Sequence, residues 1–123
     1  MSSEDVRHRV FVYGTLKRGF CRDFALENET FLGPAQTAPK YRMVNLGTYP
    51  GLLKVDDGGR SIRGEVWEVS SATLERLDEI EGTSEGEYAR EPIELLDAEF
   101  GKVEAYFYLI DTTGCPDCGD NWK

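Results

Sequence analysis

The feature that most constrains this chain is an apolar strand that runs directly into a glycine-bounded loop. Residues 10–13 read Val-Phe-Val-Tyr, Gly14 follows, and Gly19 lies five positions further on. Because Gly14 has no Cβ and tolerates positive φ, a ligand can approach its main chain closely. Successive N–H groups in such a turn can cradle a negative or polarised oxygen. A purely structural turn fits the same segment, since a strand followed by a glycine turn occurs in many folds.

Length and composition predict one globular domain. The 123 residues are 40% hydrophobic and 30% charged, which is typical of a single packed unit. We expect one domain over 1–123, with a core at about 8–110 and a polar, partly frayed tail at 111–123. No apolar run approaches the roughly 18 residues that span a bilayer, and the N-terminus lacks the apolar core of a secretory signal. The expectation is a cytoplasmic protein with no membrane partner.

The charge argues against a nucleic-acid partner. The formal net charge is −9 at pH 7, whereas contacts with phosphates need a basic surface. Lys17 and Arg18 form only a two-residue basic spot. An anionic ligand would therefore need local hydrogen-bond donors in place of a favourable overall field.

Three cysteines raise the question of a metal. Cys115 and Cys118 are spaced like half of a zinc knuckle, but a structural zinc site takes four ligands. The other candidates, Cys21 and His8, are near the opposite end of the chain. A redox Cys-x-x-Cys would be expected within a strand-turn-helix pattern, which is missing around these cysteines. We therefore expect no metal and no cofactor, and two tail thiols that can form a disulfide on oxidation.

Hydrophobic periodicity predicts about seven short strands and one main helix. The helix is expected at 72–81, with an N-cap at Ser70 or Ser71 and a stop at Gly82. One or two helical turns at 21–29 are expected to end at 31–34. The expected strands are residues 10–13, 35–38, 41–46, 52–55, 63–69, 91–96 and 102–109. Since most strand pairs have no helix between them, the predicted class is α+β, a small mixed β-barrel or sheet of six to seven strands with one main flanking helix.

If the chain is an enzyme, carboxylates must carry out its proton transfers. His8 is the only histidine and lies in an expected N-terminal arm, and no serine occupies a Gly-x-Ser-x-Gly turn. Glu81 borders the buried stripe of the helix at its C-terminus, where the dipole disfavours an anion. Asp78 and Glu79 add like charge, so we expect a raised pKa for Glu81, suited to a general acid/base. A solvated acidic helix end is the alternative.

Two segments taken together resemble the γ-glutamylcyclotransferase-like superfamily, and its AIG2-like and γ-glutamylamine cyclotransferase members most closely. Tyr13–Gly19, which reads Tyr-Gly-Thr-Leu-Lys-Arg-Gly, is similar to the family's glycine loop. Gly64–Val69 followed by Leu74–Gly82 resembles its strand and catalytic helix, and Tyr88-x-Arg90 follows at a similar spacing. The resemblance extends from Val10 to Leu109. Residues 83–87 depart from it, because they are polar where close relatives often carry a proline or an aromatic residue.

The resemblance implies a compact mixed α/β fold and a small-molecule γ-glutamyl substrate, cyclised to 5-oxoproline with release of an amine. The family's catalytic acid/base falls on Glu81. Its substrate-cradling loop falls on Tyr13, Gly14, Thr15 and Leu16, and Tyr88 is expected to line the pocket. The alternative is a binding or regulatory domain of the same fold that holds a small acidic metabolite without turnover.

Overall fold

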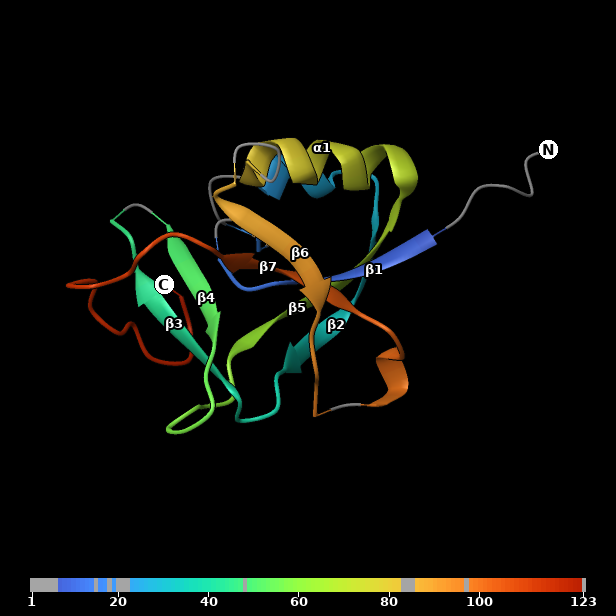
Figure 1. Ribbon diagram of the computed structural model, residues 1–123. Helices are drawn as coiled ribbons and strands as arrows, with labels where there is room; N and C mark the ends of the chain where they lie inside the picture. Colours follow the sequence, from blue (N-terminus) through green and yellow to red (C-terminus); the bar gives the residue numbers. More distant parts are fainter. Residues whose placement is uncertain are drawn as a thin grey trace.

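The fold is a mixed sheet with one helix on one side and a separate hairpin on the other (Figure 1). The computed structural model describes residues 7–14, 16–17, 19, 23–47, 49–82, 86–96 and 98–122. The strands are β1 (Arg7–Val12), β2 (Thr30–Gln36), β3 (Tyr41–Asn45), β4 (Pro50–Lys54), β5 (Arg63–Ser70), β6 (Tyr88–Pro92) and β7 (Glu104–Tyr108). The helix is α1 (Ser71–Glu81), and two short 3₁₀ turns are η1 (Asp23–Leu26) and η3 (Ala98–Phe100).

The main sheet has the strand order β2-β5-β1-β7-β6, and β3 pairs with β4 in a second sheet. Strand β1 is central, with β5 antiparallel to it on one side and β7 parallel on the other. The described strands form no closed barrel, so the predicted α+β class is confirmed in its open-sheet form. The loop after β1 therefore leaves the middle of the sheet.

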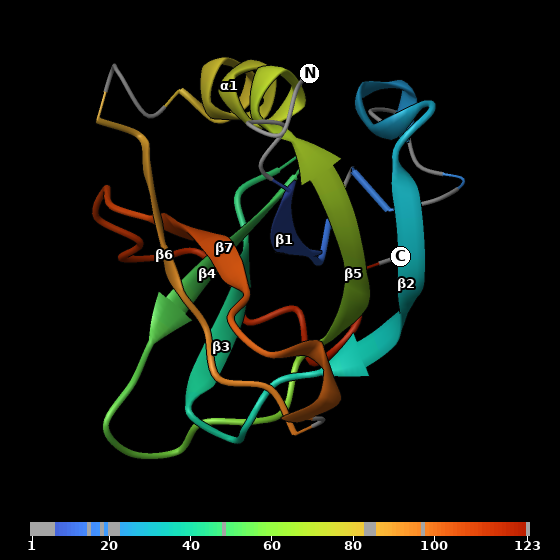
Figure 2. The same ribbon diagram turned by 90° about the vertical axis from the view of Figure 1, so that its right-hand side faces the viewer.

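The two faces of β1 pack against different layers. Val10 and Val12 belong to a cluster that includes Leu74 and Leu77 of α1, whereas Phe11 belongs to a cluster with Met43 of the hairpin. This alternation is the two-residue period of a strand buried on both faces. Helix α1 and the η1 turn lie together on the same side of the sheet (Figure 2).

The ends of α1 are fixed by local signals that the sequence contains. Ser70 is the N-cap, and its Oγ accepts a hydrogen bond from Thr73 N at 3.2 Å. Gly82 ends the helix in the left-handed conformation, with φ 71°. Both caps were predicted, and both are confirmed.

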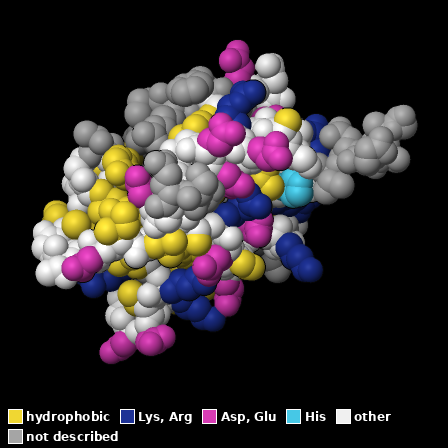
Figure 3. All heavy atoms as spheres, turned by 45° about the horizontal axis from the view of Figure 1, so that its top comes forward, with side chains coloured by type: hydrophobic (Ala, Val, Ile, Leu, Met, Phe, Trp, Pro, Cys, Tyr) yellow, Lys and Arg dark blue, Asp and Glu magenta, His cyan; other side chains and the backbone are white. Residues whose placement is uncertain are grey.

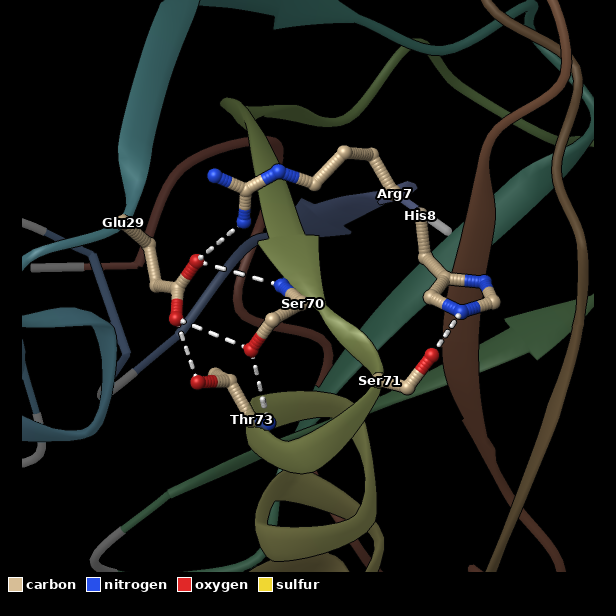
Figure 4. A network of polar contacts seen from close by, with 6 residues as sticks. All are labelled: Arg7, His8, Glu29, Ser70, Ser71 and Thr73. Atoms are coloured by element: carbon tan, nitrogen blue, oxygen red, sulfur yellow. Dashed lines mark hydrogen bonds and ion pairs between the residues drawn. The ribbon is translucent and has the colours of Figure 1, made fainter. Parts of the chain in front are cut away.

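A carboxylate from the turn before β2 reinforces the helix start. Glu29 accepts hydrogen bonds from Ser70 N and from the hydroxyl of Thr73, and it pairs with Arg7 (Figure 4). His8, expected in a solvated arm, lies in β1, and its Nε2 is 3.0 Å from Ser71 Oγ. Side chains from β1, the turn before β2 and α1 therefore meet at the N-terminus of the helix.

Two predicted strand boundaries were wrong. Strand β2 begins at Thr30, because a bulge between Phe31 and Gly33 continues the pairing through residues expected to end a helix. Strand β6 ends at Pro92, before most of the predicted strand at 91–96. The start of β2 is set by pairing with β5, which is distant in the sequence, and local composition did not indicate it.

The expectation of a frayed tail was also wrong. Cys118 N donates to Met43 O at 3.0 Å, and Trp122 packs against the cluster on the hairpin side. The ammonium of Lys17, which is buried, donates to Asn121 Oδ1 at 3.0 Å and to Trp122 O at 2.9 Å. The C-terminal segment therefore packs on the domain and against Lys17 of the glycine loop.

Charged side chains are dispersed over the helix-bearing side of the molecule. Figure 3 shows acidic and basic groups intermixed there, and hydrophobic side chains gathered toward the side that carries β3, β4 and the C-terminal segment. No helix of the described residues is long and apolar enough to cross a membrane.

We predict that Glu29→Gln lowers the free energy of unfolding by about 1–3 kcal/mol, because a buried acceptor with several donors loses its charge. Urea unfolding followed by circular dichroism measures this. Glu27→Gln is the matched control, since Glu27 is exposed, and it should change stability by less than about 0.5 kcal/mol. Equal effects of the two substitutions would contradict a role for Glu29 in holding the helix start.

Candidate functional site

A cavity of about 210 Å³ lies where the end of β1, the start of β4 and the end of α1 meet. Its described lining residues are Phe11, Val12, Tyr13, Gly14, Leu16, Tyr49, Pro50, Ile80, Glu81, Glu87, Tyr88 and Tyr106. The apolar members come mainly from β1 and its loop, and the carboxylates come from the helix end and the residue before β6. The cavity thus combines an apolar floor with a few acidic and phenolic groups, as small-molecule sites commonly do.

The structure brings the predicted site residues together. Glu81, Tyr13, Gly14, Leu16 and Tyr88 all line this one cavity, although 67 positions (81 − 14) separate the helix end from the glycine. Thr15 lies outside the described residues. Lys17 N donates to Gly14 O at 3.0 Å, which closes the loop as a tight turn.

The reason for a glycine at position 14 differs from the prediction. Gly14 is absent from the glycines with positive φ, so its tolerance of that conformation is not used. A Cβ built on Gly14 would lie 2.7 Å from Pro50 Cγ and 2.8 Å from its Cδ. Glycine is therefore required because the first residue of β4 packs directly on the loop.

Three buried tyrosines tie the cavity walls to each other. Tyr13 Oη donates to Tyr106 O at 2.6 Å, and Tyr88 Oη donates to Pro50 O at 2.9 Å. Burial, followed by the charges of neighbouring groups that include Glu81, raises the pKa of both Tyr13 and Tyr88. Both hydroxyls therefore stay protonated as donors near neutral pH, and their hydrogen bonds hold the loop and β4 in place.

Asp78, which the sequence indicated only as a source of like charge near Glu81, has partners on the sheet. Its carboxylate accepts a hydrogen bond from Tyr106 Oη at 2.6 Å, and Arg90 Nη1 contacts both of its oxygens. Arg90 also pairs with Glu104 at 3.1 Å. Asp78 thus fastens α1 to β6 and β7 one helical turn before Glu81.

Sequence reasoning also missed three polar residues of the described lining, Tyr49, Glu87 and Tyr106. Tyr106 lies in β7, and only the strand's alternation could have placed it on the helix side of the sheet. Tyr49 lies between two predicted strands, at 41–46 and 52–55, where no expected element indicated a site residue. Glu87 lay in the stretch that departs from that pattern, so no motif indicated it.

Comparison with known proteins identifies the family. The sequence profile described as gamma-glutamyl cyclotransferase, AIG2-like, matches residues 10–123. The chain therefore belongs to this family. The match includes the C-terminal segment, which the resemblance at 10–109 did not cover, and this agrees with its packing on the domain.

Individual relatives agree with this assignment. A Vibrio cholerae protein named as a candidate gamma-glutamylcyclotransferase is 40% identical over 103 residues, which are 84% of each chain. The Escherichia coli gamma-glutamylcyclotransferase family protein YtfP is 34% identical over 106 residues, 86% of this chain and 87% of its own.

Solved structures share the fold. The solution structure of Escherichia coli YtfP has a TM-score of 0.70 at 31% identity, over 93% of this chain and 94% of the other. A mouse AIG2-like protein has a TM-score of 0.73 at 26% identity, over 93% of this chain and 87% of the other.

We predict that Gly14→Ala destabilises the protein by about 1–3 kcal/mol, because its Cβ overlaps the Pro50 ring. Pro50→Ala removes the two ring atoms concerned, so the double variant should recover part of this loss in a double-mutant cycle measured by urea unfolding. Leu16→Met keeps volume and apolarity and should cost under about 1.5 kcal/mol. Strictly additive effects of Gly14→Ala and Pro50→Ala would contradict direct packing between them.

We further predict that Asp78→Asn lowers the free energy of unfolding by about 1–3 kcal/mol, because Arg90 and Tyr106 lose a charged, shared acceptor. Glu79→Gln is the matched control, since Glu79 is exposed on the same helix, and it should stay within about 0.5 kcal/mol of the parent. Thermal unfolding of both variants makes the comparison, and equal midpoints would show that Asp78 is dispensable for docking the helix.

Proposed function

We propose that this protein is a γ-glutamyl cyclotransferase that converts a γ-glutamyl amine into 5-oxoproline and a free amine, with Glu81 as general acid/base. The observation that carries the proposal is the shared cavity of Glu81 and the Gly14 loop. Membership of the gamma-glutamyl cyclotransferase, AIG2-like family supports the same reaction class.

The reaction needs few groups because the substrate supplies its own nucleophile. The α-amine of the γ-glutamyl group is mostly protonated near neutral pH, and Glu81 removes one proton from it. The freed nitrogen attacks the γ-carbonyl carbon and closes a five-membered ring. The C–N bond to the amine then breaks as the carboxylic acid of Glu81 gives its proton to the departing nitrogen. The regenerated carboxylate takes the second proton from the ring nitrogen, which leaves 5-oxoproline with a single N–H and the amine neutral.

The enzyme's main contribution is then to hold the substrate in its folded conformer. Intramolecular reactions of well-oriented groups gain large effective concentrations, so correct placement accounts for much of the acceleration. The apolar floor from Val12 and Ile80 limits water around the reacting atoms. Main-chain N–H groups of the Gly14 loop are the donors proposed for the substrate carboxylate or the developing oxyanion.

We predict that Glu81→Gln folds normally and loses turnover by about 10²–10⁴-fold, since an amide cannot take the proton. The assay is 5-oxoproline release from a panel of γ-glutamyl amines, γ-glutamyl dipeptides and glutathione. Glu79→Gln is the matched control. Glu79 is next to Ile80, which lines the cavity, but Glu79 itself is exposed and outside the described lining.

Two results, one from this assay and one from this assay combined with calorimetry, would count against the proposal. Near-normal turnover in Glu81→Gln would remove Glu81 from the mechanism. Calorimetric binding of γ-glutamyl amines without any 5-oxoproline release by the parent would favour a binding or regulatory domain of the same fold.

A further inference from the structure

Lys17 carries a buried charge that the proposed chemistry does not use. Its exposed fraction is only 7%, and among the described residues it is the only charged one that is buried. It belongs to the glycine loop but lies outside the described lining of the cavity. Because a buried ammonium is strongly disfavoured without partners, the contacts of this side chain indicate its role.

The C-terminal segment supplies those contacts. The ammonium of Lys17 donates to Asn121 Oδ1 at 3.0 Å and to Trp122 O at 2.9 Å. Both distances are typical of well-formed hydrogen bonds, and a charged donor makes such bonds stronger than those between neutral groups. The two partners are 104 and 105 positions away along the chain. The side chain of Lys17 therefore connects the glycine loop to the far end of the sequence.

Other contacts also hold the two acceptors in place. Residues 116–118 pair with β3 through two main-chain hydrogen bonds, of 2.8 and 3.0 Å. Arg63 N of β5 donates to Asp120 O at 2.7 Å, one position before the first acceptor. The ring of Trp122 packs against the hydrophobic cluster on the hairpin side. Lys17 is thus bound to a segment that β3, β5 and the core all position.

The main chain connects Lys17 to the cavity. Its N–H donates to Gly14 O at 3.0 Å, and both Gly14 and Leu16 line the cavity. At the start of this turn, Pro50 packs where a Cβ of Gly14 would lie. The turn at 14–17 is therefore held by β4 at its start and by the C-terminal segment at its end. Donors that are placed in advance bind an anion better than donors that must first be ordered.

We propose that Lys17 is a positioning residue of the site: its buried ammonium, bound by the C-terminal segment, fixes the turn at 14–17 whose main-chain N–H groups receive the substrate. This inference rests on the proposed cyclotransferase function. Lys17 acts through the turn and does not contact the substrate. Without the ammonium, the turn would have to be ordered during binding, so affinity for substrate and product would fall.

The test removes the ammonium and one of its acceptors in turn. With the γ-glutamyl amine that the parent converts fastest, we expect Lys17→Met to lower kcat/KM by about 10- to 100-fold. Asn121→Leu should lower it by about fivefold, because Trp122 O remains as an acceptor. The double variant should lose little more than Lys17→Met alone, since both changes break the same contact. Asn121→Asp keeps an oxygen acceptor and should lie within about twofold of the parent.

Two further measurements separate positioning from loss of stability, each made where circular dichroism shows the variant to be folded. Calorimetric binding of 5-oxoproline should weaken in the same order as kcat/KM. The N–H of residue 17 should exchange with solvent faster, as followed by NMR. Asp120→Asn is the matched control, because it removes only the exposed ion pair with Arg63 from the adjacent position of the same segment. It should leave kcat/KM, product affinity and exchange as in the parent.

The outcomes separate this inference from the function on which it rests. If folded Lys17→Met and Asn121→Leu keep the parent's kcat/KM and exchange rate, the inference is overturned and the cyclotransferase function stands. The same holds if Asp120→Asn or Asn121→Asp loses as much as Asn121→Leu, since the cause is then a general loosening of the segment. If Lys17→Met does not fold, the two Asn121 variants decide, because both keep the ammonium. If the parent releases no 5-oxoproline from any γ-glutamyl amine, both are overturned.

Discussion

The arrangement of the cavity depends on the carboxylate of Asp78. This group accepts hydrogen bonds from Tyr106 and Arg90, and Tyr106 in turn accepts one from Tyr13 through its carbonyl. A single chain of contacts therefore runs from the loop after β1, through β7, to the last turn of α1. Because Glu81 lies three residues after Asp78, the same contacts that dock the helix also fix the height of Glu81 above the sheet. Two of the residues that position the proposed acid/base, Asp78 and Arg90, lie outside the described cavity lining.

A second constraint sets the opposite wall. Pro50 packs where a Cβ of Gly14 would lie, and its carbonyl accepts the hydrogen bond of Tyr88 Oη. The glycine loop, the start of β4 and the start of β6 are thus held in place by direct contacts through Pro50. A loop that is rigid before substrate arrives can present its N–H groups without first being ordered, which is the condition for effective electrostatic stabilisation. The structure thus requires glycine at position 14 for packing within the protein.

The parts that sequence reasoning predicted correctly are those decided by neighbouring residues. Ser70 and Gly82 fix the ends of α1 through contacts within a few positions, so their types suffice to place the helix. The role of Asp78 could not be predicted in this way, because its partners Arg90 and Tyr106 lie in β6 and β7. The ordering of the C-terminal segment depends on Lys17, which is 104 positions from Asn121 along the chain. The family motifs predicted which residues would share the cavity, and pairing across the sheet decided what holds them there.

The charge of the chain then limits how this cavity can bind its substrate. A protein of net charge −9 with two carboxylates in the described lining of its cavity repels a purely anionic ligand. In the proposed function, main-chain donors would hold the carboxylate of a γ-glutamyl group and Glu81 would meet its ammonium. The product 5-oxoproline has lost that ammonium and is an anion, so the acidity of the cavity would favour its release.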